Sequence, residues 1–390
     1  MNIINNKNIQ LIRNQPLFSS SDSLEELITF KKFPVFIGAT NEKIEKDLFT
    51  EMSFDIDKTN GIIQLRNLLN QEIVYSYYHS EALGETWDEH RVSFAKFIGR
   101  KYKNILDIGG SSGSLAIEHR KYHNSNWTIV DPNLTKNNIS DKNINFIEGL
   151  IEDYVPELRK KDAIVHSHTL EHIYEPLKFL NLLSANLEKK NTHIFSVPNF
   201  NSYLLKNQSN ILNFEHTYLL TEELIDVLLE AYGFKVVKKN YFKNHSIFYK
   251  TLLLGQKKED IFLEINSKLH NYYLQNKENF LTSYKKIKNL INDYHEVKLK
   301  NNKSEGFVFG AHIFSQVFYF MGLDKKLIKN VLDNSEIKEN LRLYGTEWII
   351  KQPNVIKNLS KPIVILNVGQ YQNEVKQQLL KLNPSVLIVE

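Results

Sequence analysis

Residues 104–131 constrain the fold of this chain more than any other stretch. A short apolar run at residues 105–108 leads into a turn rich in glycine, and residues 115–121 can form a helix. A second apolar run at residues 127–130 then ends at Asp131. Glycine lets a backbone turn sharply and approach a ligand closely beneath the first turn of a helix. The stretch therefore predicts a strand, a turn, a helix and a second strand that ends in an acid.

The spacing inside the turn differs from that of a dinucleotide site. It reads D-x-G-G-S-S-G from Asp107, where dinucleotide-binding turns read G-x-G-x-x-G. An acid at the end of the following strand can hold two ribose hydroxyls. The stretch resembles the first motif of class I S-adenosylmethionine (SAM) methyltransferases, whose turn faces the methionine part of SAM. The resemblance implies cofactor contacts at Asp107, Gly109, Gly110, Ser111, Gly113 and Asp131.

The remainder of this region alternates strands with helices. Apolar runs predict strands at residues 144–148, 162–165 and 192–199, and an amphipathic helix at residues 177–187. Residues 221–234 predict a helix with Thr221 as its N-cap and a glycine at its end. Such alternation indicates an α/β fold with a mainly parallel, doubly wound, Rossmann-like sheet. Ligands of these sheets bind beyond the carboxyl ends of the strands.

Regions of different character flank the predicted sheet. Residues 33–39 read as a strand, and residues 61–70 as a strand or a short helix. Near the other end, Gly310 and Asp333 repeat the order of a glycine and then an acid, with fewer glycines, which favours a helper domain over a second cofactor site. We therefore divide the chain into an N-terminal region, a SAM-binding domain, a helical connector and a second, smaller α/β domain, at residues 1–73, 74–255, 256–300 and 301–390.

Composition excludes several classes of protein. The net charge of +4 comes from 49 basic and 45 acidic residues, and this scattered excess does not favour a nucleic-acid partner. The absence of cysteine excludes disulfides and thiolate metal sites. No apolar run has the length of a membrane helix. We expect a cytoplasmic protein with a small-molecule substrate, no nucleic-acid or membrane partner and no zinc.

A longer set of motifs is similar to the sugar C-methyltransferases that act on nucleotide-linked keto-deoxysugars. That family has a tyrosine-rich approach segment, a strand that ends in proline, a Tyr-His-Glu-His stretch, a helix that ends in Ala-Gly-Phe, a His-Gly-Gly-Ser segment and a second Rossmann-like unit. The counterparts of these features here are residues 74–90, 194–204, 213–216, 231–234, 245–248, 306–318 and 332–350. This chain keeps the last two residues of Tyr-His-Glu-His and the histidine of His-Gly-Gly-Ser, but it lacks the tyrosine, the first histidine and both glycines. It also lacks the cysteines of the family's N-terminal zinc module. The resemblance runs from about residue 74 to the end, and it implies methyl transfer from SAM to a sugar, in surface-glycan or deoxysugar biosynthesis.

The resemblance also indicates acceptor-side residues. His216 with Glu215 is the first candidate for the catalytic base. A purely structural role of His216, capping the following helix region, has equal weight. His168 lies at the end of the fourth predicted strand, where this class transfers the methyl group, so it can touch SAM or the acceptor. Further candidates are Tyr78 and His79 of the approach segment and His245 of the His-Gly-Gly-Ser counterpart.

Two groups of residues have more than one interpretation. Leu150 and Ile151 follow the third predicted strand, where this class packs the adenine, and they serve equally well as plain core residues. His166, His168 and His172 crowd the end of the fourth strand like a metal set, although no further ligand is obvious. The alternatives to a sugar methyltransferase are an O- or N-methyltransferase of another small molecule, a non-catalytic protein of the SAM-binding fold and an NAD-binding protein.

Overall fold

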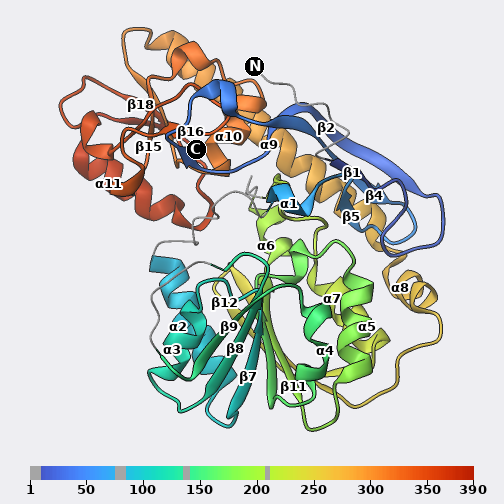
Figure 1. Ribbon diagram of the computed structural model, residues 1–390. Helices are drawn as coiled ribbons and strands as arrows, with labels where there is room; N and C mark the ends of the chain where they lie inside the picture. Colours follow the sequence, from blue (N-terminus) through green and yellow to red (C-terminus); the bar gives the residue numbers. More distant parts are fainter. Residues whose placement is uncertain (1–9, 75–84, 135–140, 207–210) are drawn as a thin grey trace.

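The computed structural model describes residues 10–74, 85–134, 141–206 and 211–390 (Figure 1). Tyr78 and His79 lie outside the described residues, so their predicted roles stay predictions. None of the helices in the described part of the chain combines the length and the apolar character that crossing a membrane requires.

A seven-stranded sheet forms the middle of the chain, in the order β12-β13-β11-β10-β7-β8-β9. Neighbouring strands from β11 to β9 are parallel, and β13 is antiparallel to both of its neighbours. This confirms the mainly parallel, doubly wound sheet. The strands are β7 (Asn104–Ile108), β8 (Asn126–Asp131), β9 (Ile144–Glu148), β10 (Ala163–Ser167), β11 (Thr192–Pro198), β12 (Phe234–Phe242) and β13 (Ser246–Leu253).

Helices cover both faces of this sheet (Figure 1). On one side lie α2 (Glu85–Ile98) and α3 (Ser114–Arg120), and on the other lie α4 (Val155–Leu158), α5 (Pro176–Asn186) and α7 (Glu222–Ala231). The cap predicted for α7 is confirmed, because the Thr221 hydroxyl accepts a hydrogen bond from Leu224 N at 3.4 Å. Burying apolar side chains between helices and sheet holds these layers together.

The N-terminal region is an antiparallel sheet of β2 (Leu24–Pro34), β4 (Phe49–Asp57) and β5 (Ile63–Leu65). The strand predicted at residues 33–39 is wrong for most of its length, because β2 ends at Pro34 and Gly38 has φ +99°. Residues 61–70 form strands and no helix. Its short elements are β1 (Gln10–Ile12), β3 (Ala39–Thr40), β6 (Asn67–Leu69) and α1 (Gln71–Val74).

A five-stranded parallel sheet, in the order β17-β15-β14-β18-β19, follows two connecting helices. The long helix α9 contacts β4 of the N-terminal sheet as well as β18 and β19, so it ties the two ends of the chain together (Figure 1). The elements are α8 (Ile261–Leu269), α9 (Tyr272–Lys300), β14 (Gly306–Phe309), α10 (Ile313–Phe320), β15 (Asn330–Leu332), β16 (Arg342–Leu343), β17 (Ile350–Lys351), β18 (Ile363–Ile365), α11 (Gln372–Leu382) and β19 (Leu387–Val389).

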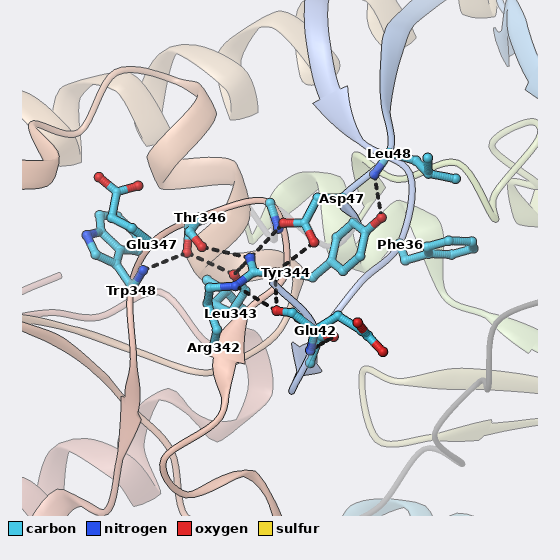
Figure 2. Close-up of polar contacts among 12 residues, drawn as sticks. Phe36, Glu42, Asp47, Leu48, Arg342, Leu343, Tyr344, Thr346, Glu347 and Trp348 are labelled. Carbon is cyan, nitrogen blue, oxygen red and sulfur yellow. Dashed lines mark hydrogen bonds and ion pairs between the residues drawn. The ribbon is translucent and has the colours of Figure 1, made fainter. Parts of the chain in front are cut away.

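A buried ion pair joins the N-terminal region to this second sheet (Figure 2). The carboxylate of Asp47 accepts hydrogen bonds from Arg342 Nη1 at 2.6 Å, from Arg342 Nη2 at 2.7 Å and from Gly345 N at 2.8 Å. Leu48 N donates to the Tyr344 hydroxyl at 2.7 Å beside it. Because the Asp47 side chain is fully buried, Arg342 is needed to compensate its lost hydration.

Candidate active site

The glycine turn lies between β7 and α3, at the carboxyl edge of the seven-stranded sheet. Gly109 and Gly113 have φ +75° and +76°, which glycine adopts without strain. A Cβ atom on Gly110 would lie 2.5 Å from Asp107 Oδ2, so a side chain there would collide with that carboxyl group. Two hydrogen bonds fix the turn, from Gly109 N to Val130 O at 2.8 Å and from Ser111 N to Asp131 Oδ2 at 2.9 Å.

Two acids lie beneath and beside this turn. Asp107 is buried, and within the described residues neither of its carboxyl oxygens has a hydrogen-bond partner. Burial raises the pKa of Asp107, and the nearby charge of Asp131 raises it further. An unpaired buried carboxyl is costly unless a ligand satisfies it. SAM carries a sulfonium and an ammonium group, so the two acids and the open glycine turn fit it.

The residues implied as adenine contacts lie at the same edge of the sheet. Leu150 is 42% exposed, whereas Ile151 is buried in the core. Leu150 is thus available to a ligand, and Ile151 packs behind it. Asp131 is held by a second hydrogen bond, from Asn133 N to Oδ1 at 2.7 Å.

Imidazole rings gather beside the glycine turn, around the start of β13. His168 and His245 both contact the Ser246 hydroxyl, at 2.8 Å from His168 Nε2 and 2.5 Å from His245 Nδ1. The ring of Trp87, on α2, meets the His245 ring edge-on at 4.5 Å between centroids. Thr169 connects the cluster to the turn, because its hydroxyl donates to Ile108 O at 3.2 Å.

His168 itself has φ +51°, a strained value for a residue with a side chain. The strain turns the chain sharply at the end of β10 and places His168 toward β13. Burial lowers the pKa of His168 and of His245 to about 3, so both imidazoles are neutral at pH 7. Neutral imidazoles keep a lone pair that can receive a proton.

A second group of side chains adjoins the first. His168 Nδ1 lies 3.4 Å from Glu171 Oε1, and His172 Nε2 lies 3.8 Å from the same oxygen. The His172 and His216 rings meet edge-on at 5.4 Å between centroids. Glu171 is fully buried, and its carboxyl oxygens have no hydrogen-bond partner in the described part of the chain. Burial raises its pKa to about 7.

Asn213 fixes the hydrogen-bonding role of His216. Asn213 Oδ1 accepts from Glu215 N at 2.8 Å and from His216 N at 2.9 Å, which leaves Asn213 Nδ2 to donate to His216 Nδ1 at 3.0 Å. We assign the ring proton of His216 from this network to Nε2. Because burial lowers its pKa to about 3, His216 offers an N–H donor at neutral pH.

The alternative of a metal set at His166, His168 and His172 was not our expectation, and His166 lies apart from the other two. His166 Nε2 lies 2.9 Å from His193 Nε2, and the His166 ring stacks on Phe195 inside the core. His168 and His172, in contrast, both approach Glu171 Oε1, at 3.4 and 3.8 Å.

Sequence reasoning missed several members of the site. They are Glu171, Ser246, Trp87, His90 and His172, of which His172 was considered only as a metal ligand. His90 is buried on α2, and its Nε2 has no hydrogen-bond partner among the described residues. The sequence did contain a signal for two of them. Glu171 and His172 are an adjacent acid and histidine shortly after a strand that ends at the ligand-binding edge.

Among the residues that the structure describes, two triads bring potential metal ligands together. His90, His168 and His245 form one, and Glu171, His172 and His216 form the other, each with ligand atoms within 4.8 Å of one another. Hydrogen bonds already engage His168 Nε2, His245 Nδ1 and His216 Nδ1. This arrangement suits proton transfer, and the expectation that the chain binds no zinc stays a prediction.

The second sheet lies next to this site. His312, which precedes α10, lies close enough to Glu215 for a Coulombic interaction between them. Tyr371 and Tyr203 of α6 (Phe200–Leu205) also interact electrostatically. The turns that follow β14 and β18 therefore approach the acceptor-side residues. A cavity of about 520 Å³ lies elsewhere, lined by residues 40–45 and 340–342 together with Glu347 and Ile349, and it shares no residue with the glycine turn.

Comparison with known proteins identifies the class of the central region. Residues 77–239 match the family model described as a methyltransferase domain. The match contains the glycine turn, Asp131, His166 of β10 and His168 after it. Residues 77–239 thus have the sequence features of a methyltransferase domain, and the central sheet has a Rossmann-like fold.

Solved structures resemble the chain only in part. The N,N-8-amino-8-demethyl-D-riboflavin dimethyltransferase RosA from Streptomyces davawensis is 17% identical with a TM-score of 0.35, over 43% of this chain and 55% of that one. The mitomycin 7-O-methyltransferase MmcR is 14% identical with a TM-score of 0.34, over 42% of this chain and 54% of that one. The N-methyltransferase NodS from Bradyrhizobium japonicum WM9 is 12% identical with a TM-score of 0.33, over 43% of this chain and 97% of that one.

The chain thus spans about half the length of the first two proteins. These likenesses carry no argument about the acceptor. No curated protein sequence matches the chain.

Proposed function

We propose that the protein methylates a sugar, most readily one linked to a nucleotide, in surface-glycan or deoxysugar biosynthesis. The observation that carries the proposal is the cluster of neutral imidazoles around a buried carboxyl, placed beside the glycine turn and next to a second α/β sheet. Simple methyl transfer to a strong nucleophile needs only positioning. A hydroxyl, or a carbon next to a ketone, also needs a base and a hydrogen-bond donor.

The chain's own residues divide this work. Asp131 binds the ribose hydroxyls of the cofactor, and Asp107 with the glycine turn receives its methionine part. When bound, SAM supplies an activated methyl group on a sulfonium. His216, whose hydrogen bond with Asn213 leaves its proton on Nε2, donates from that nitrogen to the acceptor's oxygen. His245 has a lone pair for the acceptor's proton, and His168 contacts the same serine hydroxyl as His245. Glu215 lies beside His216 to influence its charge.

The nature of the acceptor rests on the resemblance of residues 194–248 and 306–350 to nucleotide-sugar C-methyltransferases. The second α/β sheet supports it, because a linked nucleotide gives an acceptor a large part that does not react and needs its own binding surface. Binding energy from such remote groups helps to orient the reacting centre. As part of this proposal, the SAM-binding domain begins at residue 74, the helical connector at residue 256 and the second α/β domain at residue 301.

A mass-spectrometric screen of nucleotide sugars with SAM tests this proposal. The expected result is a gain of one methyl group on one member of the panel, together with formation of S-adenosylhomocysteine. A panel in which free phenols or amines are methylated while every nucleotide sugar stays unchanged would establish the alternative of an O- or N-methyltransferase of another small molecule.

The His216→Ala variant tests the acceptor side of the site. Its SAM affinity should stay near the wild-type value, because His216 lies away from the glycine turn. Single-turnover methylation should slow by about 10²–10⁴-fold, the usual range for losing a group that handles a proton or a developing charge. Glu215→Gln should slow the same step by less. Full turnover in His216→Ala would remove His216 from the mechanism.

A further inference from the structure

Four side chains form a continuous series of contacts from the site to a buried carboxyl. His245 Nδ1 lies 2.5 Å from Ser246 Oγ, which lies 2.8 Å from His168 Nε2. On the other side of that ring, His168 Nδ1 lies 3.4 Å from Glu171 Oε1. A small rotation of either side chain makes this last contact a hydrogen bond, and such contacts commonly tighten when ligands bind.

Each group in this series can both donate and accept. A hydroxyl donates one hydrogen bond and accepts others, and a neutral imidazole donates at one nitrogen and accepts at the other. When Glu171 is ionised, His168 Nδ1–H donates to it, Ser246 donates to His168 Nε2, and His245 Nδ1–H donates to Ser246. This arrangement leaves a free lone pair on His245 Nε2. A proton that arrives there reverses every hydrogen bond, and Glu171 becomes the neutral acid.

From this geometry we infer that His245, Ser246, His168 and Glu171 form a proton relay that carries the methyl acceptor's proton from His245 Nε2 to Glu171. The inference rests on the proposed function for the source of the proton. Glu171 touches none of the reacting atoms, so it is a positioning residue that acts through His168.

The atoms and electrons of the step balance. A bond forms between the acceptor atom and the methyl carbon, the carbon–sulfur bond breaks, and its electron pair stays on sulfur. The acceptor's proton moves to His245 Nε2, and one proton moves at each link of the relay until Glu171 is protonated. The products are the methylated acceptor, S-adenosylhomocysteine and a neutral Glu171, which loses its proton to solvent by the reverse route after product release.

The surroundings of Glu171 suit the end of such a relay. In the described part of the chain, its titratable neighbours are His168, His172, His216, Tyr203 and Tyr218. Burial raises the pKa of Tyr203 and Tyr218, so both phenols stay neutral, and it lowers the pKa of His168 and His216 to about 3. With a pKa of about 7, the Glu171 carboxyl exchanges its proton in the physiological range.

Infrared spectroscopy of the purified protein tests the end point without any substrate. Spectra recorded between pH 5 and pH 9 are compared for the wild type, Glu171→Gln and the control Glu175→Gln, whose side chain is exposed. We expect a protonated-carboxyl band that disappears with a midpoint near pH 7, is missing in Glu171→Gln and is kept in Glu175→Gln. Identical spectra for the wild type and Glu171→Gln would overturn the relay.

Single-turnover methylation tests the path. With the acceptor found in the nucleotide-sugar screen, Glu171→Gln and Ser246→Ala should each slow the step by about 10²-fold or more while SAM affinity is unchanged. The double variant should be no slower than the slower single variant, because both changes interrupt one path. The wild-type rate should rise with pH around 7, Glu171→Gln should lose this rise, and Glu171→Asp should recover part of the rate.

The two experiments separate the relay from the proposed function. Wild-type rates in both single variants, or losses that multiply in the double variant, would overturn the relay while methylation itself stands. If the wild type methylates no nucleotide sugar, the proposed function fails. In that case the infrared titration decides on Glu171: a band that titrates and depends on Glu171 supports the proton store, and a spectrum independent of Glu171 overturns it.

Discussion

The mainly parallel seven-stranded sheet and the parallel five-stranded sheet contain turns of the same backbone design. In the first, Gly109 N donates to Val130 O at 2.8 Å and Ser111 N donates to Asp131 Oδ2 at 2.9 Å. In the second, Gly310 N donates to Leu332 O at 2.7 Å and Ala311 N donates to Asp333 Oδ2 at 2.7 Å. In both, an acid at the end of the next strand accepts hydrogen bonds from the turn.

The side chains around the two turns differ. Asp107 lies two residues before Gly109 and carries an unpaired buried carboxyl, whereas Val308 occupies the corresponding position before Gly310. In the second turn, Lys338 Nζ lies 3.6 Å from Asp333 Oδ2 and so balances part of its charge. The difference teaches that one backbone design can hold two different sets of side chains. The first turn has the acids and the open glycine that our proposal assigns to SAM.

The largest expected effect concerns the ion pair between the N-terminal region and the second sheet. Asp47→Ala would leave Arg342 buried without its partner, so we expect the free energy of unfolding to fall by about 3–5 kcal/mol. Urea denaturation measures it. The control is Glu42→Ala, which removes an exposed pair with Lys46 and should cost about 0–1 kcal/mol. If the second turn has no part in cofactor binding, SAM affinity of folded Asp47→Ala should be unchanged.

Asp131→Ala should weaken SAM binding by about 2–4 kcal/mol, because it removes charge-assisted hydrogen bonds to the ribose. Asp333→Ala removes the corresponding acid of the second turn and should leave SAM affinity unchanged. Isothermal titration calorimetry compares the two variants. Equal losses of SAM affinity in both variants would show that the acid of the first turn has no special role in binding SAM.

Glu171, at the edge of the seven-stranded sheet, should make the free energy of unfolding depend on pH. Burial raises the pKa of Glu171 from 4.5 to about 7, so its contribution is fully present below pH 4.5 and is lost as the pH rises through 7. Glu171→Gln should therefore gain about 3 kcal/mol relative to the wild type between pH 4.5 and pH 8. Urea denaturation at several pH values measures this gain. Glu175→Gln should follow the wild type, and parallel curves for Glu171→Gln and the wild type would contradict the prediction.

The smallest expected effect concerns the space for a Cβ atom at corresponding positions of the two turns, Gly110 and Ala311. Gly110→Ala places a Cβ atom against Asp107, and overpacking of this kind costs about 1–3 kcal/mol of stability and should reduce SAM affinity as well. Ala311 already carries a Cβ atom in the second turn, so Ala311→Gly should leave SAM affinity unchanged. Thermal denaturation with and without SAM measures both variants.

Local signals in the sequence predicted most of the first sheet. The runs at residues 105–108 and 144–148, Asp131 as a strand end, and Thr221 as a cap all depend on neighbouring residues, and each lies in the predicted element. Residues 33–39 and 61–70 were harder to interpret, because their strands depend on pairing with distant chain segments. Tertiary pairing decides short apolar runs of this kind.

The site was predicted less completely for a similar reason. His166 and His168 are two residues apart, and sequence spacing does not show that His168 adopts φ +51° and leaves the strand. Glu171 and Ser246 are 75 residues apart in the chain, and only the antiparallel return of β13 beside β11 brings Ser246 to the same edge. Residues that meet through topology give no joint signal in a single sequence.

Calorimetry of the wild-type protein with SAM, S-adenosylhomocysteine and NAD tests the central claim most directly. The glycine turn, with Asp107 beneath it and Asp131 beside it, should bind SAM and S-adenosylhomocysteine at one site per chain and should not bind NAD. The same titration on Asp131→Ala should show the loss of this site. Tight binding of NAD with no binding of SAM or S-adenosylhomocysteine would contradict the assignment of the turn and of the enzyme.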